Sequence, residues 1–201
     1  MVLSGSCLMS KGKHGSGARE IIKWLKGQLV HLEDELFVLD LFCGDGSWQG
    51  IDFYASMPNA HFTHADRDSE KLWGLPKVGK SQRFFTADFQ HFLGDCMELH
   101  RTYEFIVCDN PALASSGASF EKVLPKLARV VEPGGVLIFN FGVGSRNKKF
   151  KNNEQDKAYG YYLSKIEKQT GLPVQHATLV TRNKKCGIYQ AVIIFGGGKP
   201  K

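Results

Sequence analysis

The chain has 201 residues, of which 42% are hydrophobic and 23% charged, which is typical of one soluble α/β domain with a sizeable core. No apolar run approaches the roughly 20 residues that span a membrane, and the first residues lack the pattern of a secretion signal. We therefore expect a cytoplasmic protein. The five cysteines form no C-x-x-C pair, which argues against a disulfide framework or a zinc site, and we predict no metal.

Short apolar runs alternate with amphipathic stretches between a loose, basic segment at 1–17 and a frayed tail at 197–201. The hydrophobic periodicity predicts helices over 18–30, 117–131 and 155–170, and strands over 36–42, 61–66, 83–88, 103–109, 135–141, 174–181 and 188–195. Strands that alternate with helices predict a doubly wound, mostly parallel sheet with helices on both faces, in a single domain over 18–196.

Four of the predicted strands carry an aspartate at or near their carboxyl end, namely Asp40, Asp66, Asp88 and Asp109. Ligands bind beyond the carboxyl ends of the strands in such sheets. A series of acidic residues at successive strand ends therefore indicates a binding site at this edge.

The strongest motif is VLDLFCGDGSWQG, residues 38–50, where a strand passes into a helix. Gly44 and Gly46 allow a tight turn and a close approach of the backbone to a ligand. Asp40 either fixes this turn or accepts a hydrogen bond from a cationic amine. The segment resembles the first motif of class I S-adenosylmethionine-dependent methyltransferases, D-x-x-x-G-x-G, and the resemblance covers about 36–195.

This resemblance implies a Rossmann-like sheet of seven strands in the order 3-2-1-4-5-7-6, with S-adenosylmethionine (SAM) as cofactor and S-adenosylhomocysteine (SAH) as product. It assigns Asp66 to the ribose hydroxyls and Asp88 to the adenine amino group, with Phe89 packing nearby. The implied cofactor contacts are Asp40, Phe42, Cys43, Gly44, Asp45, Gly46, Trp48, Asp66, Arg67, Asp88, Phe89 and Asp109.

A rival interpretation is a dinucleotide-binding fold. Gly44, Gly46 and Gly50 also satisfy G-x-G-x-x-x-G, and Asp66 lies about 20 residues further on. The glycine pattern is weak by itself. The early Asp40, the corner at 109–111 and the terminal hairpin favour the methyltransferase.

The predicted fourth strand ends in EFIVCDNPALASSG, residues 104–117. This segment resembles the D-P-P-Y or N-P-P-Y motif with which related enzymes orient the amino group of a base. Asp109, Asn110 and Pro111 are therefore the candidate catalytic residues, although Ala112 replaces the aromatic residue that would stack on the base. The form D-x-P-A-L also resembles motifs of some ribosomal RNA methyltransferases. Cys108 is expected in the core rather than as a nucleophile.

A second resemblance is incomplete. TRNKKCGIY, residues 181–189, is similar to a stretch of RNA ribose 2′-O-methyltransferases, which also use a lysine and a glutamate to activate a hydroxyl. Asn140 and Gly187 occupy those two places here. This disfavours ribose methylation by that mechanism and leaves a kinship in substrate binding open.

The net charge of +6 is concentrated in three segments, 11–26, 145–157 and 182–185, which hold 13 of the 26 basic residues and three of the 20 acidic ones. We expect them to converge on the rim of the active site and bind RNA phosphates. The candidate substrate-binding residues are Arg146, Lys148, Lys149, Arg182, Lys184 and Lys185. Tyr159, Tyr161 and Tyr162 either stack on bases or pack the helix against the sheet.

The sequence thus predicts a SAM-dependent methyltransferase acting on RNA, at a base or a ribose, as a monomer or weak dimer. Two alternatives stay open. One is a methyltransferase for a small molecule or a protein. The other is a catalytically degenerate methyltransferase fold that only binds, which the altered Asn110 and Ala112 would support.

Overall fold

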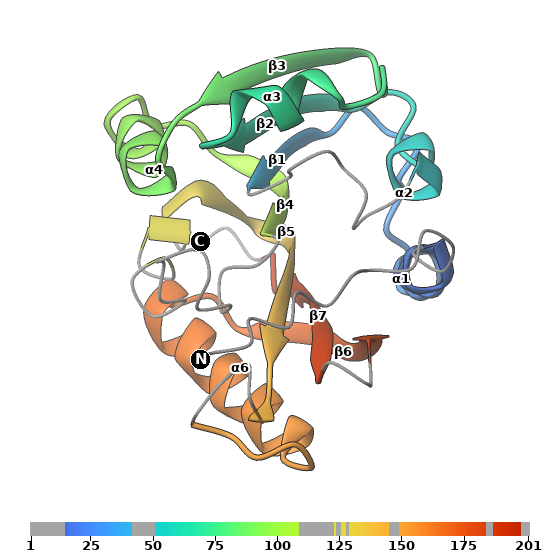
Figure 1. Ribbon diagram of the computed structural model, residues 1–201, viewed down its shortest axis with the longest axis vertical. Helices are drawn as coiled ribbons and strands as arrows, with labels where there is room; N and C mark the ends of the chain where they lie inside the picture. Colours follow the sequence, from blue (N-terminus) through green and yellow to red (C-terminus); the bar gives the residue numbers. More distant parts are fainter. Residues whose placement is uncertain are drawn as a thin grey trace, which may run out of the picture.

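The computed structural model describes residues 15–41, 51–108, 123, 126–127, 129–144, 149–183 and 187–197. These residues form a seven-stranded sheet in the order β3-β2-β1-β4-β5-β7-β6, which confirms the predicted order (Figure 1). The strands are β1 (Phe37–Leu41), β2 (His61–Asp66), β3 (Ser81–Thr86), β4 (Tyr103–Cys108), β5 (Val131–Gly142), β6 (Val174–Asn183) and β7 (Ile188–Phe195). The first five pair in parallel, and β7 is antiparallel to both β5 and β6.

Helices cover both faces of this sheet. They are α1 (Gly15–Gly27), α2 (Ile51–Ala55), α3 (Ser69–Trp73), α4 (Phe89–Glu98) and α6 (Gln155–Thr170), and residues 123, 126–127 and 129–130 are also helical. Figure 1 shows α1 and α2 on one side of the sheet and α4 and α6 on the other. This is the doubly wound arrangement that the sequence predicts.

The core divides into two layers because a parallel sheet needs cover on both faces. Alternate strand residues such as Val38 and Ile138 pack with Ile21 and Leu25 of α1 in one layer. Their neighbours, such as Leu39, Phe139 and Ala191, pack with α4, α6 and residues 123, 127 and 130 in the other. All eight residues of β7 are buried, so this strand lies in the interior although it follows the basic turn.

The third and fifth strands differ most from their expected bounds. The third strand covers 81–86 rather than 83–88, because its register with β2 pairs His61 with Ser81 and Asp66 with Thr86. The carbonyl of Asp88 instead accepts from the amide of Phe92 and leads into α4. The fifth strand begins at Val131, where Val131 pairs with Tyr103 before a shift of register carries the pairing past 133–134.

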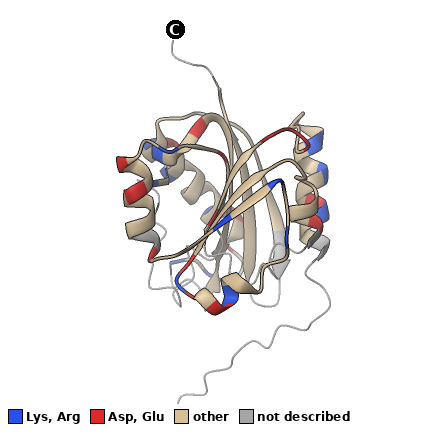
Figure 2. Cartoon of the chain, turned by 90° about the horizontal axis from the view of Figure 1, so that it is seen from above, with Lys and Arg blue, Asp and Glu red and all other residues tan. Residues whose placement is uncertain are grey.

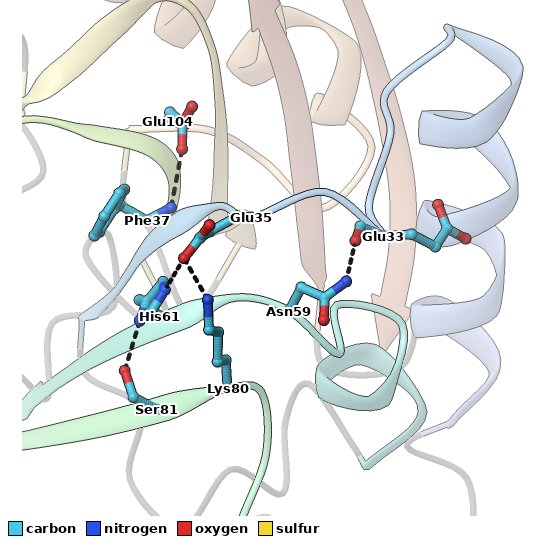
Figure 3. Close-up of polar contacts among 8 residues, drawn as sticks. All are labelled: Glu33, Glu35, Phe37, Asn59, His61, Lys80, Ser81 and Glu104. Carbon is cyan, nitrogen blue, oxygen red and sulfur yellow. Dashed lines mark hydrogen bonds and ion pairs between the residues drawn. The ribbon is translucent and has the colours of Figure 1, made fainter.

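Polar contacts fix the amino edge of the sheet (Figure 3). Glu35 Oε1 accepts from Lys80 Nζ at 2.8 Å and from His61 Nε2 at 2.6 Å, and these hydrogen bonds lower the pKa of Glu35 to about 2. The other His61 nitrogen, Nδ1, lies 2.7 Å from Ser81 Oγ. Glu104 Oε2 accepts from the amide of Phe37 at 2.9 Å, across from β4 to β1. The cations at this edge are therefore engaged with carboxylates of the fold itself.

The end of α1 has a conformation that usually requires glycine. The amide of Val30 donates to the carbonyl of Leu25 and the amide of Leu29 to that of Lys26, a Schellman motif. Leu29 occupies its left-handed position with a φ of 62°, and 79% of the residue is exposed. The branched residue gains little packing there in return for its backbone strain.

We predict that Leu29→Gly raises the free energy of unfolding by about 1 kcal/mol, because glycine adopts a positive φ without strain. Leu99→Gly is the matched control, since Leu99 is also exposed but has no positive φ. That control should be neutral or destabilising. Urea denaturation followed by circular dichroism measures both, and equal effects of the two changes would contradict the assignment of strain to Leu29.

Candidate functional site

Two of the predicted acidic residues lie at the carboxyl edge of adjacent strands. Asp66 is the last residue of β2, is half-buried, and its Oδ1 accepts from the amide of Asp68 at 3.0 Å. The carbonyl of Asp66 accepts from the amide of Ala87 at 3.1 Å, so the exits of β2 and β3 are joined. Asp88 follows with an exposed side chain, whose Oδ1 lies 3.9 Å from His91 Nδ1. Arg67, next to Asp66, is also exposed.

Asp40 has a different environment from these two. It lies in β1, is fully buried, and belongs to a polar cluster on the face covered by α1 and α2. Its Oδ2 accepts from Tyr54 Oη at 2.9 Å and from His64 Nδ1 at 3.0 Å. No donor among the described residues reaches the other oxygen, Oδ1. Sequence reasoning did not connect His64 to this site, because the pairing depends on the register of Asp40 with His64 between β1 and β2.

The exit of β5 meets the turn between β6 and β7. The amide of Val143 donates to the carbonyl of Gly187 at 2.9 Å, and Gly142 and Asn183 both pair with Ile188. Because β6 is parallel to β5, both strands end at the same edge of the sheet. The described residues that precede the predicted basic segments, Gly142 and Val143 on one side and Asn183 on the other, therefore lie at this edge.

Lys149 is the predicted substrate-binding residue whose side chain the structure describes. Its Nζ lies 3.6 Å from the centroid of the Tyr161 ring, and Lys165 Nζ lies 5.6 Å from the same ring. Tyr161 also packs on Phe150 and Tyr162. The ring thus holds ammonium groups from the segment after β5 and from α6 close together.

The other two tyrosines of α6 support the packing interpretation. Tyr162 is buried in the core against Phe139 and Phe141. Burial raises the pKa of Tyr159 to about 12, and no described residue offers a partner to its buried hydroxyl. A role in stacking on bases is therefore not supported for Tyr162.

The basic residues of α1 contribute less than the sequence suggests. Arg19 pairs with Asp52 at 3.1 Å, and Lys26 pairs with Glu33 at 2.6 Å. Glu33 lies shortly before β1, so Lys26 is near the amino edge rather than the predicted rim. Figure 2 shows basic and acidic residues interspersed along the helices that flank the sheet. The two ion pairs of α1 therefore do not support a place for this helix in the predicted basic rim.

The incomplete resemblance to ribose methyltransferases agrees with the local geometry. Asn140 is fully buried and lies opposite Gln190 in the register of β5 with β7. Gly187 has a φ of 61°, and a Cβ there would lie 3.0 Å from the carbonyl oxygen of Val143. A glutamate side chain would be strained at position 187, where the ribose methyltransferases carry the activating glutamate. Cys108 is fully buried, as expected of a core residue.

Several predicted site residues cannot be placed. Phe42, Cys43, Gly44, Asp45, Gly46, Trp48, Asp109, Asn110, Pro111, Arg146, Lys148, Lys184 and Lys185 lie outside the described residues. Phe89 and Arg182 lie in α4 and β6, but their side chains are outside the description too. Within the described part of the chain, no cluster of three or more His, Cys, Asp or Glu could hold a metal ion. No helix of that part is long and apolar enough to cross a membrane.

No protein-family model and no curated protein sequence matches this chain. Solved structures do. The fibrillarin/Nop5p complex matches with a TM-score of 0.62 at 11% identity, over 90% of this chain and 83% of that one. Magnesium protoporphyrin IX methyltransferase from Synechocystis PCC 6803 with bound SAM matches with a TM-score of 0.57 at 17% identity, over 90% and 78%. A candidate SAM-dependent methyltransferase from Streptococcus mutans matches with 0.58 at 14% identity, over 89% and 48%.

The chain therefore spans about half the length of the Streptococcus protein, with 48% of it covered. These likenesses show that the fold is that of the class I methyltransferases.

The close approach of Val143 to Gly187 can be tested. We predict that Gly187→Ala lowers the free energy of unfolding by about 2 kcal/mol, because it adds a backbone strain of about 1 kcal/mol to a collision with Val143. Gly171→Ala is the matched control, since Gly171 has a φ of 66° with nothing within 4 Å, and it should cost only about 1 kcal/mol. Thermal denaturation measures both, and equal losses would show that the exit of β5 does not contact the turn.

Proposed function

We propose that this chain is a SAM-dependent methyltransferase whose methyl acceptor lies on RNA. The observation that supports the cofactor is the position of Asp66 and Asp88 at the carboxyl ends of neighbouring strands in a sheet of the methyltransferase order. The half-buried carboxylate of Asp66 can accept hydrogen bonds from a ribose, and the exposed Asp88 can accept one from an amino group. The buried, unsatisfied Oδ1 of Asp40 suits a cationic amine such as that of the methionyl part.

SAM would supply an electrophilic methyl group on a sulfonium, so the protein needs mainly to bind and orient the acceptor. In this proposal Asp109, Asn110 and Pro111, which directly follow β4, accept hydrogen bonds from an acceptor amine. This would orient its lone pair toward the methyl group. An amine suits this chain better than a ribose hydroxyl, because Asn140 and Gly187 stand where a lysine and a glutamate would be needed.

RNA is supported by the two basic segments that start from adjacent points at the exits of β5 and β6. Lys149 is held over Tyr161 beside Lys165, which keeps positive charge at one place near this edge. Lysines and arginines there would bind the phosphates of RNA and position it without recognising its base sequence. The protoporphyrin enzyme among the similar structures keeps a small-molecule acceptor as the second candidate.

The cofactor is tested by calorimetric titration with SAH. We predict binding with a Kd of about 1–100 μM and a loss of at least about tenfold in Asp66→Ala, which removes the acceptor for the ribose hydroxyls. Glu33→Ala is the control, because it removes an exposed acid before β1, at the opposite edge, and should leave the affinity unchanged. A folded wild-type protein that binds neither SAM nor SAH would overturn the proposal that the chain is a methyltransferase. It would favour the degenerate fold that only binds a partner.

The RNA surface is tested by comparing two charge-reversal variants that carry the same net charge as each other. We predict that the triple variant Lys149→Glu, Lys184→Glu and Lys185→Glu weakens binding of a fluorescein-labelled 20-nucleotide RNA by at least about tenfold and reduces its salt dependence. The control triple Lys71→Glu, Lys77→Glu and Lys168→Glu carries the same charge change outside the three basic segments and should weaken binding far less. Equal losses in the two triples, measured by fluorescence anisotropy, would exclude a localised RNA site.

A further inference from the structure

We propose that His64 and Tyr54 are positioning residues that orient the carboxylate of Asp40 toward the cofactor; this inference rests on the proposed function. The three side chains come from β2, α2 and β1, and each of these residues is at most 1% exposed. Tyr54 and His64 both donate to the same oxygen, Oδ2, at 2.9 and 3.0 Å. The other oxygen, Oδ1, has no donor among the described residues.

The hydrogen bonds determine which nitrogen of His64 carries the proton. Gln82 Oε1 accepts from the amide of Val78 at 3.2 Å, and Gln82 Nε2 donates to the carbonyl of Pro76 at 3.0 Å. These backbone partners assign the orientation of the amide group. Gln82 Nε2 also lies 3.3 Å from His64 Nε2, which must therefore accept. The proton of the imidazole is then on Nδ1, from which it is donated to Asp40.

Aromatic packing holds the ring of His64 in this orientation. Phe62 and Phe84 each stack on it with centroids 5.4 Å away and interplanar angles of 8° and 15°. Tyr54 contacts it edge-on at 6.0 Å. Gln82 and Phe84 also line a cavity of about 710 Å³ outside β3, so the polar chain runs from that cavity inward to Asp40. Neither Asp40 nor His64 can turn without breaking several of these contacts.

The arrangement makes the two oxygens of Asp40 unequal. Oδ2 is satisfied by two donors, whereas Oδ1 is buried without one from the described residues. A buried carboxylate oxygen needs a donor, since leaving it bare is costly. Asp40 lies one residue before the end of β1. It belongs to the predicted cofactor motif, residues 38–50, which continues beyond this strand. The α-ammonium group of SAM or SAH carries the donors that would satisfy Oδ1.

The test compares two replacements of His64. His64→Phe keeps an aromatic ring between Phe62 and Phe84 but removes the donor. His64→Asn loses the ring but can place an N–H near the position of Nδ1. We predict that SAH binding weakens about tenfold in His64→Phe and in Tyr54→Phe, and by less than about threefold in His64→Asn, by calorimetry on folded samples. Thermal stability should show the opposite order for the two His64 variants.

The outcomes separate the two proposals. The positioning role is wrong if wild type binds SAH and His64→Phe binds it as tightly. It is also wrong if the affinity for SAH follows thermal stability across the variants. In both cases the proposed cofactor is unaffected. If folded wild type does not bind SAH, the proposed function and this role both fail. Nitrogen-15 spectra of the His64 ring give an independent reading. A proton on Nδ1 supports the arrangement, and a proton on Nε2 overturns it.

Discussion

The parallel pairing of β1 with β2 on one side and β4 on the other is the constraint on which the site depends. It sets Asp40 opposite His64 and opposite Val107, and it brings the ends of these strands to one edge. In a sheet that is buried on both faces, polar side chains reach solvent mainly at the ends of the strands. Asp66 and Asp88 accordingly lie where β2 and β3 end, at the carboxyl edge.

The cluster around Asp40 departs from an otherwise apolar interior. Asp40, His64, Asn140 and Gln190 are the fully buried polar residues of the described chain, and all lie on the face covered by α1 and α2. Burying such groups costs free energy unless each finds a partner. Tyr54, His64 and Gln82 provide that compensation for one oxygen of Asp40. The other oxygen, Oδ1, is the atom on which the proposed contact with the cofactor rests.

The two edges of the sheet differ in how their charges are used. At the amino edge, Lys26 and Lys80 are bound to Glu33 and Glu35. At the carboxyl edge, Lys149 Nζ lies 3.6 Å from the centroid of the Tyr161 ring. The lysines of the two edges thus contact groups of different kinds, which the net charge of +6 does not reveal.

The sequence by itself determined the fold class, the strand order through its resemblance, and the acidic residues at the strand ends, because these follow from local periodicity and motif spacing. It placed β3 two residues late, since apolar runs do not reveal register. Only the tertiary structure decided that Asp40 meets His64, that Lys26 is bound to Glu33, and that Tyr162 belongs to the core. Each of these contacts joins residues from different elements, whose distance in space is set by packing and not by spacing along the chain.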